Sequence, residues 1–283
     1  MLALKTFTRT FVATFFVLGL MTWAREASAA IKVASWNIQV FGQKKVMNAD
    51  VMRVIVDTVK QYDLILVQEI RDPTDIATTA LMKQLNAATG NAYSILVSNR
   101  LGRANTTEQY AFIYKKSALK VVDSYHYADS ADLFAREPFV VRFSTTQATA
   151  KNFFVVPLHA ESSAAVAEIG SLVKVYDDAA KRWNIKNGIL MGDWQAGCSY
   201  FAKKYWETNP LRSDSRFTWI IGDDTKSSVG KASCPYDRAV VAGDKLRAHA
   251  AKGRTVYLDT KFNLTTDSMK LVSDHYPIEF ELN

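Results

Sequence analysis

The chain has 283 residues, of which 48% are apolar, with 35 Lys and Arg against 28 Asp and Glu and a formal net charge of +7. Only 12 Gly and 6 Pro are present, which excludes a disordered, collagen-like or low-complexity chain. The positive charge is compatible with solubility alone and with weak attraction to a polyanion such as nucleic acid.

The first thirty residues have the pattern of an export signal. Lys5 and Arg9 precede an apolar run over residues 11–24, and an A-x-A cleavage sequence follows at 27–29. We therefore predict a signal peptide over 1–29, because the run is shorter than an ordinary membrane-spanning helix. After cleavage, we expect no membrane-spanning segment. The mature chain has a formal net charge of +5, because the signal peptide removes a net +2 contributed by Lys5, Arg9, Arg25 and Glu26.

Apolar runs and helical periodicity alternate from residue 31 onward, without a linker or a charge block, so we predict one domain over 30–283. Strands are expected at Ile31–Trp36, Asp63–Gln68, Tyr93–Ser98, Tyr110–Tyr114, Leu119–Tyr125, Phe139–Phe143, Phe153–Pro157, Gly188–Met191 and Ile278–Leu282. Helices are expected at about 50–61 and 74–88 and at Ser163–Trp183. The run of consecutive strands between 93 and 157 favours two mixed sheets covered by helices over a doubly wound parallel sheet.

The two cysteines, Cys198 and Cys234, are expected to form a disulfide, because an exported chain meets oxidising conditions. Two cysteines and four scattered histidines provide no spacing typical of a structural zinc site.

Polar side chains stand at the ends of several predicted strands. A single such residue usually caps a helix or turn, but several together favour a site at one edge of a sheet. They mix histidine, carboxylate and amide, a set suited to metal-assisted hydrolysis of a phosphate ester, in which histidine transfers protons and carboxylates hold a hard cation. They are Asn37, Gln68, Glu69, His159, Asp193, Asp274 and His275.

Motifs spread over nearly all of 31–283 resemble the secreted DNase I family of the endonuclease/exonuclease/phosphatase superfamily. Glu69 and the SDH sequence at 273–275 alone would indicate only the superfamily, whereas the arginines of the motifs, the cysteine pair and the Ala165–Ile169 helix sequence are specific to DNase I-like enzymes. The motifs are ASWNIQVFG at 34–42, QEIRD at 68–72, LGR at 101–103, REP at 136–138, LH at 158–159, AVAEI at 165–169, MGD at 191–193, CSY at 198–200, CPYDR at 234–238 and SDHYP at 273–277. The resemblance implies a four-layer α/β sandwich.

The resemblance also implies the roles of the site residues. His159 and His275 correspond to an acid–base pair, oriented by Glu108 and Asp237 respectively. The metal ligands would be Glu69, Asp193, Asp274 and Asn37, with Mg²⁺ or Mn²⁺ as the cofactor. Contacts to phosphate and to double-stranded DNA would come from Asn37, Gln195, Arg71, Arg103 and Arg136.

Several positions depart from the family pattern. Gln195 stands in place of an asparagine and is longer by about 1.5 Å, a displacement that can change a rate on the order of 10²-fold. Gly197 replaces an acid, while Thr106 and Gln39 replace an aromatic residue and an arginine that grip DNA.

The family's calcium-binding loop is replaced here by residues 223–228, which argues against a structural Ca²⁺, although Asp129, Asp132 and Glu137 could hold one. Residues 95–97 lack the aromatic of the actin-binding edge, so we expect no actin binding.

The remaining histidines and tryptophans are expected to be structural or at the surface: His126, His249, Trp183, Trp206 and Trp219.

The sequence therefore predicts a secreted, monomeric DNA endonuclease of low sequence specificity, either extracellular or periplasmic. Two alternatives stay open at this point. One is a secreted phosphodiesterase of the same superfamily that acts on phospholipid or inositol phosphate. The other is a DNA-binding protein with weakened catalysis, for which Gln195 is the only support.

Overall fold

The computed structural model describes residues 30–103 and 107–283. The predicted signal peptide and Thr106 lie outside the described residues. Two six-stranded mixed sheets form the centre. The first has the order β11 (Arg254–Thr255), β12 (Ile278–Leu282), β1 (Ile31–Phe41), β2 (Leu64–Ile70), β4 (Gln109–Lys115) and β3 (Tyr93–Val97). The second has the order β5 (Lys120–His126), β6 (Phe139–Ser144), β7 (Asn152–Pro157), β8 (Gly188–Asp193), β10 (Asp237–Ala242) and β9 (Phe217–Trp219).

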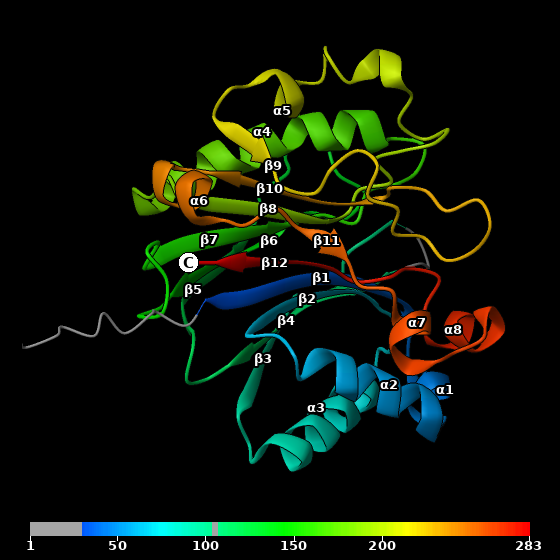
Figure 1. The fold of residues 1–283 in the computed structure, drawn as a ribbon. Helices are drawn as coiled ribbons and strands as arrows, with labels where there is room; N and C mark the ends of the chain where they lie inside the picture. The colour runs from blue at the N-terminus through cyan, green and yellow to red at the C-terminus, as the bar shows by residue number, and fades with distance from the viewer. Residues whose placement is uncertain (1–29, 104–106) are drawn as a thin grey trace, which may run out of the picture.

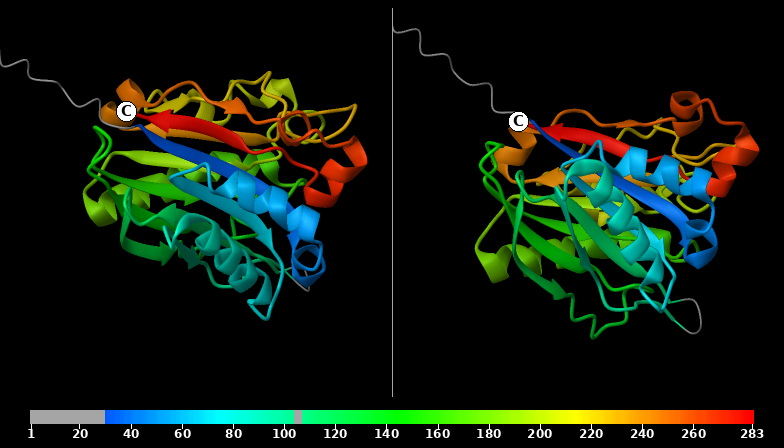
Figure 2. Two further views of the ribbon diagram at one scale, coloured as in Figure 1. Left: turned by 60° about the horizontal axis from the view of Figure 1, so that its bottom comes forward. Right: turned by 90° about the horizontal axis from the view of Figure 1, so that it is seen from below.

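The sheets pack face to face, and helices cover both outer faces, which makes four layers (Figure 1). Figure 2 shows two of these helices, α2 and α3, across the outer face of the first sheet. That face carries α1 (Gln43–Val46), α2 (Ala49–Val59), α3 (Ile76–Thr89), α7 (Leu258–Phe262) and α8 (Thr266–Val272). The second sheet carries α4 (Ala165–Trp183) and α5 (Pro210–Ser213), with α6 (Asp244–His249) after β10 and a 3₁₀ turn at Lys203–Tyr205. The predicted fold class is confirmed.

Apolar side chains alternate between the two faces of the strands and so form three apolar layers, one between the sheets and one under the helices on each outer face. In β2, Leu64 and Leu66 join the core between the sheets, whereas Ile65 and Val67 pack under α2 and α3. In β8, Ile189 faces the core between the sheets. Successive side chains of a strand point to opposite faces, so strands buried on both sides read as continuous apolar runs.

The predicted strands and helices are all present, and the structure adds five short helices that were not predicted, α1, α5, α6, α7 and α8. β1 continues past Trp36 to Phe41, and sequence reasoning missed the short strands β9 and β11 and the central strand β10. The missed strand β10 begins with the charged residues Asp237 and Arg238, both of which are buried. A strand that begins with two charged residues resembles a loop in sequence. In the structure, Asp237 pairs with His275, and Arg238 points to the opposite face of the sheet.

Candidate active site

Strand ends from both sheets meet at one end of the sandwich. β1 and β2 are parallel, as are β7 and β8, so Asn37 and Glu69 come together, and so do His159 and Asp193. The antiparallel strand β10 begins at this same edge, and its first residue Asp237 lies opposite Asp193. The structure therefore gathers five of the seven predicted strand-end residues into one largely buried cluster: Asn37, Glu69, His159, Asp193 and His275. Gln68 instead donates to the Ser35 hydroxyl at 2.8 Å, and Asp274 is not among the side chains that the described residues bring within ligating distance as a group.

The first histidine is held by a glutamate. His159 Nδ1 lies 2.6 Å from Glu108 Oε1, and both side chains are buried. Glu108 Oε2 also lies 3.4 Å from Arg71 and 3.2 Å from Arg136. Although burial opposes it, His159 and the two arginines hold the pKa of Glu108 below its usual range. Glu108 in turn raises the pKa of His159 against burial.

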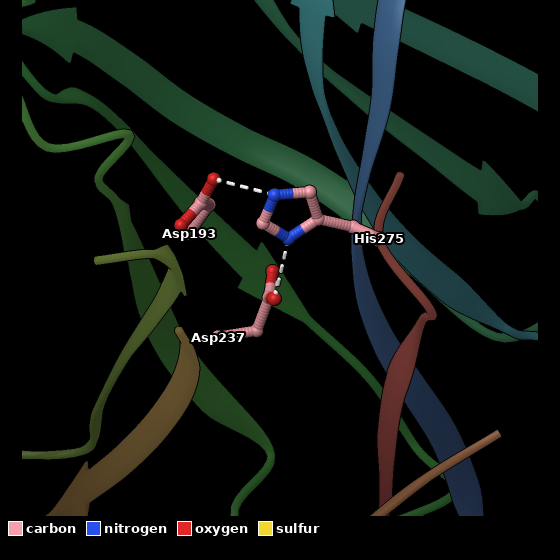
Figure 3. Close-up of side chains that lie close together, drawn as sticks. All are labelled: Asp193, Asp237 and His275. Carbon is pink, nitrogen blue, oxygen red and sulfur yellow. Dashed lines mark hydrogen bonds and ion pairs between the residues drawn. The ribbon is translucent and has the colours of Figure 1, made fainter. Parts of the chain in front are cut away.

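The second histidine is held by an aspartate that makes no ion pair with an arginine among the described residues. His275 Nδ1 lies 2.8 Å from Asp237 Oδ2, and His275 Nε2 lies 3.4 Å from Asp193 Oδ2 (Figure 3). Burial raises the pKa of Asp237, and the carboxylates of Asp193 and Asp237 raise the pKa of His275 to about 10 despite its burial. The pair therefore keeps its shared proton at neutral pH.

Asp193 lies between the two histidines. Its Oδ2 is 3.7 Å from His159 Nε2 and 3.4 Å from His275 Nε2. Burial opposes ionisation, but the two histidines keep the pKa of Asp193 below its usual range. The carboxylate also accepts hydrogen bonds from the amides of Asn37 at 3.1 Å and Gln195 at 3.0 Å. The longer Gln195 side chain thus reaches the carboxylate, from a backbone with a left-handed φ of 51°.

Glu69 is positioned by an irregularity shared by β1 and β2. The register of the two strands shifts after Asn37, and Glu69 and Val40 have left-handed φ values of 61° and 48°. This conformation is strained for a β-branched residue such as Val40. In return, Glu69 accepts hydrogen bonds from Val40 N–H and from the Asn37 amide, both at 2.9 Å.

Lys45 is a site neighbour that the sequence analysis missed. Its Nζ donates to the carbonyls of Ile38 and Val272, both at 2.6 Å, and so joins the end of β1 to the segment that carries His275. Burial lowers the pKa of Lys45 to about 8, against the opposing effect of Asp274 and Glu69. No motif distinguishes this lysine from others, so only the fold identifies it.

The oxygen-rich side of the cluster has the chemistry of a hard-cation site. Asp193, Asp237 and His275 offer ligand atoms within 4.8 Å of one another. Asp237 Oδ1 and Asp274 Oδ1 are buried and have no hydrogen-bond partner among the described residues. Carboxylate oxygens of this kind suit Mg²⁺ or Mn²⁺. Asn37 is oriented as a donor to Glu69 and Asp193, because its Oδ1 accepts from Gln39 N–H at 2.9 Å.

The three predicted DNA-contacting arginines lie in different surroundings. Arg71 is partly exposed and faces Glu69 and Glu108. Arg136 is largely buried, and it donates to the His159 carbonyl at 3.2 Å. Arg103 is exposed and pairs with Asp132 at 2.6 Å.

Other predicted features can be located as well. The disulfide Cys198–Cys234 is confirmed. Asp129, Asp132 and Glu137 are not among the side chains that the described residues bring within ligating distance as a group. His126 stacks on Phe139, and His249 is exposed. Trp183, Trp206 and Trp219 are partly buried against the core beneath α4, as expected for structural residues.

Comparison with known proteins identifies the family. The model of the endonuclease/exonuclease/phosphatase family matches residues 34–275. The chain belongs to this family. It is 41% identical to human deoxyribonuclease gamma, over 90% of this chain and 87% of the relative. It is 38% identical to deoxyribonuclease-1 of Bos taurus, over 89% of this chain and 92% of the relative. The chain is therefore a member of the DNase I-like branch of the family.

Solved structures with little sequence identity share the fold. A mannosyl-6-phosphatase from Bacteroides thetaiotaomicron has a TM-score of 0.61 at 15% identity, with 89% of this chain and 99% of that chain covered. The human Nocturnin catalytic domain has a TM-score of 0.58 at 14% identity, with 90% and 94% covered. These likenesses concern the arrangement of strands and helices alone.

Proposed function

We propose that this protein is an endonuclease that hydrolyses phosphodiester bonds of double-stranded DNA with little sequence specificity. The observation that carries the proposal is the arrangement of His159–Glu108 and His275–Asp237 around Asp193. It occurs in a chain about 40% identical to proteins named deoxyribonucleases.

The two histidines transfer the protons of the reaction. One histidine removes the proton of an attacking water, and the other donates a proton to the leaving oxygen. Glu108 and Asp237 accept from Nδ1, which leaves each Nε2 facing Asp193 and the reacting phosphate. The amide groups of Asn37 and Gln195 stand beside Asp193 as donors for a non-bridging phosphate oxygen.

Glu69, Asp193 and Asp274 are the residues proposed to hold Mg²⁺ or Mn²⁺, and Asn37 orients the first two through its amide N–H groups rather than as a ligand. When bound, the cation supplies Lewis-acid stabilisation of the charge on the phosphoryl oxygens. The orphaned Asp274 Oδ1 supports this assignment, because a buried carboxylate oxygen without a donor is costly unless a cation compensates it.

DNA is proposed to be held by phosphate contacts. Arg71 and Arg103 have exposed side-chain area for such contacts, whereas Arg136 acts mainly through Glu108 and the His159 carbonyl. Contacts of this kind carry no sequence information, which agrees with low specificity.

We further propose that the protein is secreted, as a monomer made of one domain over 30–283, after removal of residues 1–29. The disulfide supports an oxidising destination. Within the described residues, no helix combines the length and apolar character needed to cross a membrane. The absence of actin binding stays a prediction.

The test is nicking of supercoiled plasmid in Mg²⁺, Mn²⁺ or EDTA by the wild type, His159→Ala and the exposed control His249→Ala. We expect nicking that needs the cation, a loss on the order of 10²–10⁴-fold in His159→Ala and none in the control. Absence of nicking in every condition would exclude the nuclease proposal. Hydrolysis of sphingomyelin in the same preparation would replace it with the phospholipid alternative.

A further inference from the structure

A cavity of about 500 Å³ lies beneath the segment that joins β8 to α5, on the outer face of the second sheet. It is separate from the catalytic cluster, because Asp237 and Arg238 are consecutive in β10 and point to opposite faces of that sheet. Six of its lining residues carry the argument: Lys203, Phe201, Trp206, Arg212, Pro235 and Arg238.

Arg238 places a buried positive charge in the wall of this cavity, and the carboxylates that act on it, Asp223 foremost, lie beyond ion-pair distance. Its side chain is fully buried, and its guanidinium donates to the carbonyls of Ala196 at 2.8 Å and Gly222 at 3.2 Å. Within the described residues, no carboxylate lies within 4.0 Å of it, and its Nε has no hydrogen-bond partner. Burial lowers its pKa to about 10, so the group is still charged at neutral pH. A buried charge of this kind favours an anion beside it.

A second guanidinium and an aromatic wall complete the cavity. Arg212 lies 4.8 Å from the ring centre of Trp206, and its partner Asp223, at 2.8 Å, is half exposed and exchangeable with solvent ions. The rings of Phe201 and Trp206 are 4.4 Å apart and line the same cavity. The volume falls in the usual range for small-molecule sites, in which an apolar wall is combined with a few polar groups.

We propose that this cavity binds a nucleoside monophosphate, with the phosphate at Arg212 and Arg238 and the sugar and base against Trp206, whose ring is backed by buried Phe201. Arginine suits the phosphate because its planar fork matches phosphate oxygens, and aromatic side chains provide contact for a base of any identity. The choice of a nucleotide rests on the proposed function, since endonucleolytic hydrolysis leaves DNA fragments that end in a nucleotide phosphate, and a nucleoside monophosphate is the smallest compound of that kind. Because Arg238 holds the Ala196 carbonyl, the occupied cavity adjoins the loop that carries Gln195.

Indole N–H signals give a readout for each of the two sites. Trp206 lines the cavity, whereas the Trp36 indole donates to the His275 carbonyl at 2.9 Å and reports on the catalytic cluster. The protein, labelled with ¹⁵N at tryptophan, is titrated in EDTA with deoxyadenosine 5′-monophosphate and separately with inorganic phosphate. Single Trp→Phe variants assign the signals.

We expect the Trp206 signal to shift and saturate with the nucleotide while the Trp36 signal stays in place. Arg212→Gln should weaken this binding at least tenfold, whereas Lys204→Gln, next to the cavity but not in its lining, should not. Absence of a Trp206 shift, a shift confined to Trp36 or unchanged binding in Arg212→Gln would overturn the proposal. Equal affinity for inorganic phosphate would overturn the nucleoside part.

Plasmid nicking by Arg212→Gln is measured alongside, since this residue is outside the catalytic cluster. Nicking without any Trp206 shift would reject the cavity site alone. A saturating Trp206 shift in a protein that does not nick would reject the proposed function and leave the cavity site standing.

Discussion

The two histidine–carboxylate pairs differ in how their negative charge is balanced. Glu108 is neutralised by Arg71 and Arg136 as well as by His159. Among the described residues, the Asp237 side chain makes an ion pair with His275 alone, and its second oxygen has no hydrogen-bond partner. The first pair is therefore held in place by several ion pairs around Glu108. The position of the second pair depends instead on the backbone of the segments that carry Asp237 and His275, such as the bond from His275 N–H to the Ser273 hydroxyl. Two histidine–carboxylate pairs with the same hydrogen-bonding arrangement are thus stabilised in two different ways.

The largest expected effect concerns the loop that leads to the second pair. The disulfide Cys198–Cys234 closes 36 residues, and such a loop stabilises by about 3–4 kcal/mol in the chain-entropy model. Replacing both cysteines with serine should lower the free energy of unfolding by that amount, measured by urea denaturation. A loss below about 1 kcal/mol would show that the loop is ordered without its cross-link.

Exchanging each carboxylate for its amide tests the comparison directly. Glu108→Gln leaves Arg136 buried without its counter-ion and should cost about 3 kcal/mol of stability, although the exposure of Arg71 moderates the loss. Asp237→Asn removes a carboxylate whose charge burial already opposes, and Asp193 remains as a counter-ion of His275, so it should cost less, about 1–2 kcal/mol. Both variants should lose nicking activity, so equal stability losses would contradict the proposed difference between the pairs.

The proton on the second pair makes stability depend on pH in the metal-free protein. The pKa of His275 is raised to about 10, above its ordinary value of 6.5, so its contribution is complete below pH 6.5 and is lost as the pH rises towards 10. Urea denaturation in EDTA at pH 6.5 and 9 should show a decline that is smaller in His275→Gln by about 2 kcal/mol, after allowance for relaxation of the site. Parallel curves for the two proteins would refute this assignment.

The smallest effect is expected at Gln195. Its amide donates to both oxygens of Asp193, so Gln195→Ala should lower the nicking rate about tenfold. Gln195→Asn, which restores the family's side chain, should change the rate by less than that. A large gain in Gln195→Asn would show that the glutamine is a handicap in catalysis.

The polar residues at the strand ends could be predicted from the sequence, because an apolar run that stops at a charged or amide residue is a local pattern. His159 and Asp193 were located in this way, and the family resemblance supplied Glu108 and Asp237. The β1–β2 irregularity at Val40 and Glu69 was not readable, because it depends on pairing between strands 30 residues apart in sequence. Lys45 and Arg238 act through carbonyl groups, and contacts to the backbone leave no side-chain pattern in the sequence.

The pairing of β1 with β12 has a consequence for synthesis in the cell. Asn37 belongs to the first strand and His275 lies just before the last, and β1 and β12 are neighbours in the sheet. A chain under synthesis lacks its second histidine until residue 275 has been added, and it lacks a complete first sheet until β12, Ile278–Leu282, has been added. A chain that stops before residue 275 therefore cannot assemble the second histidine–carboxylate pair of the site.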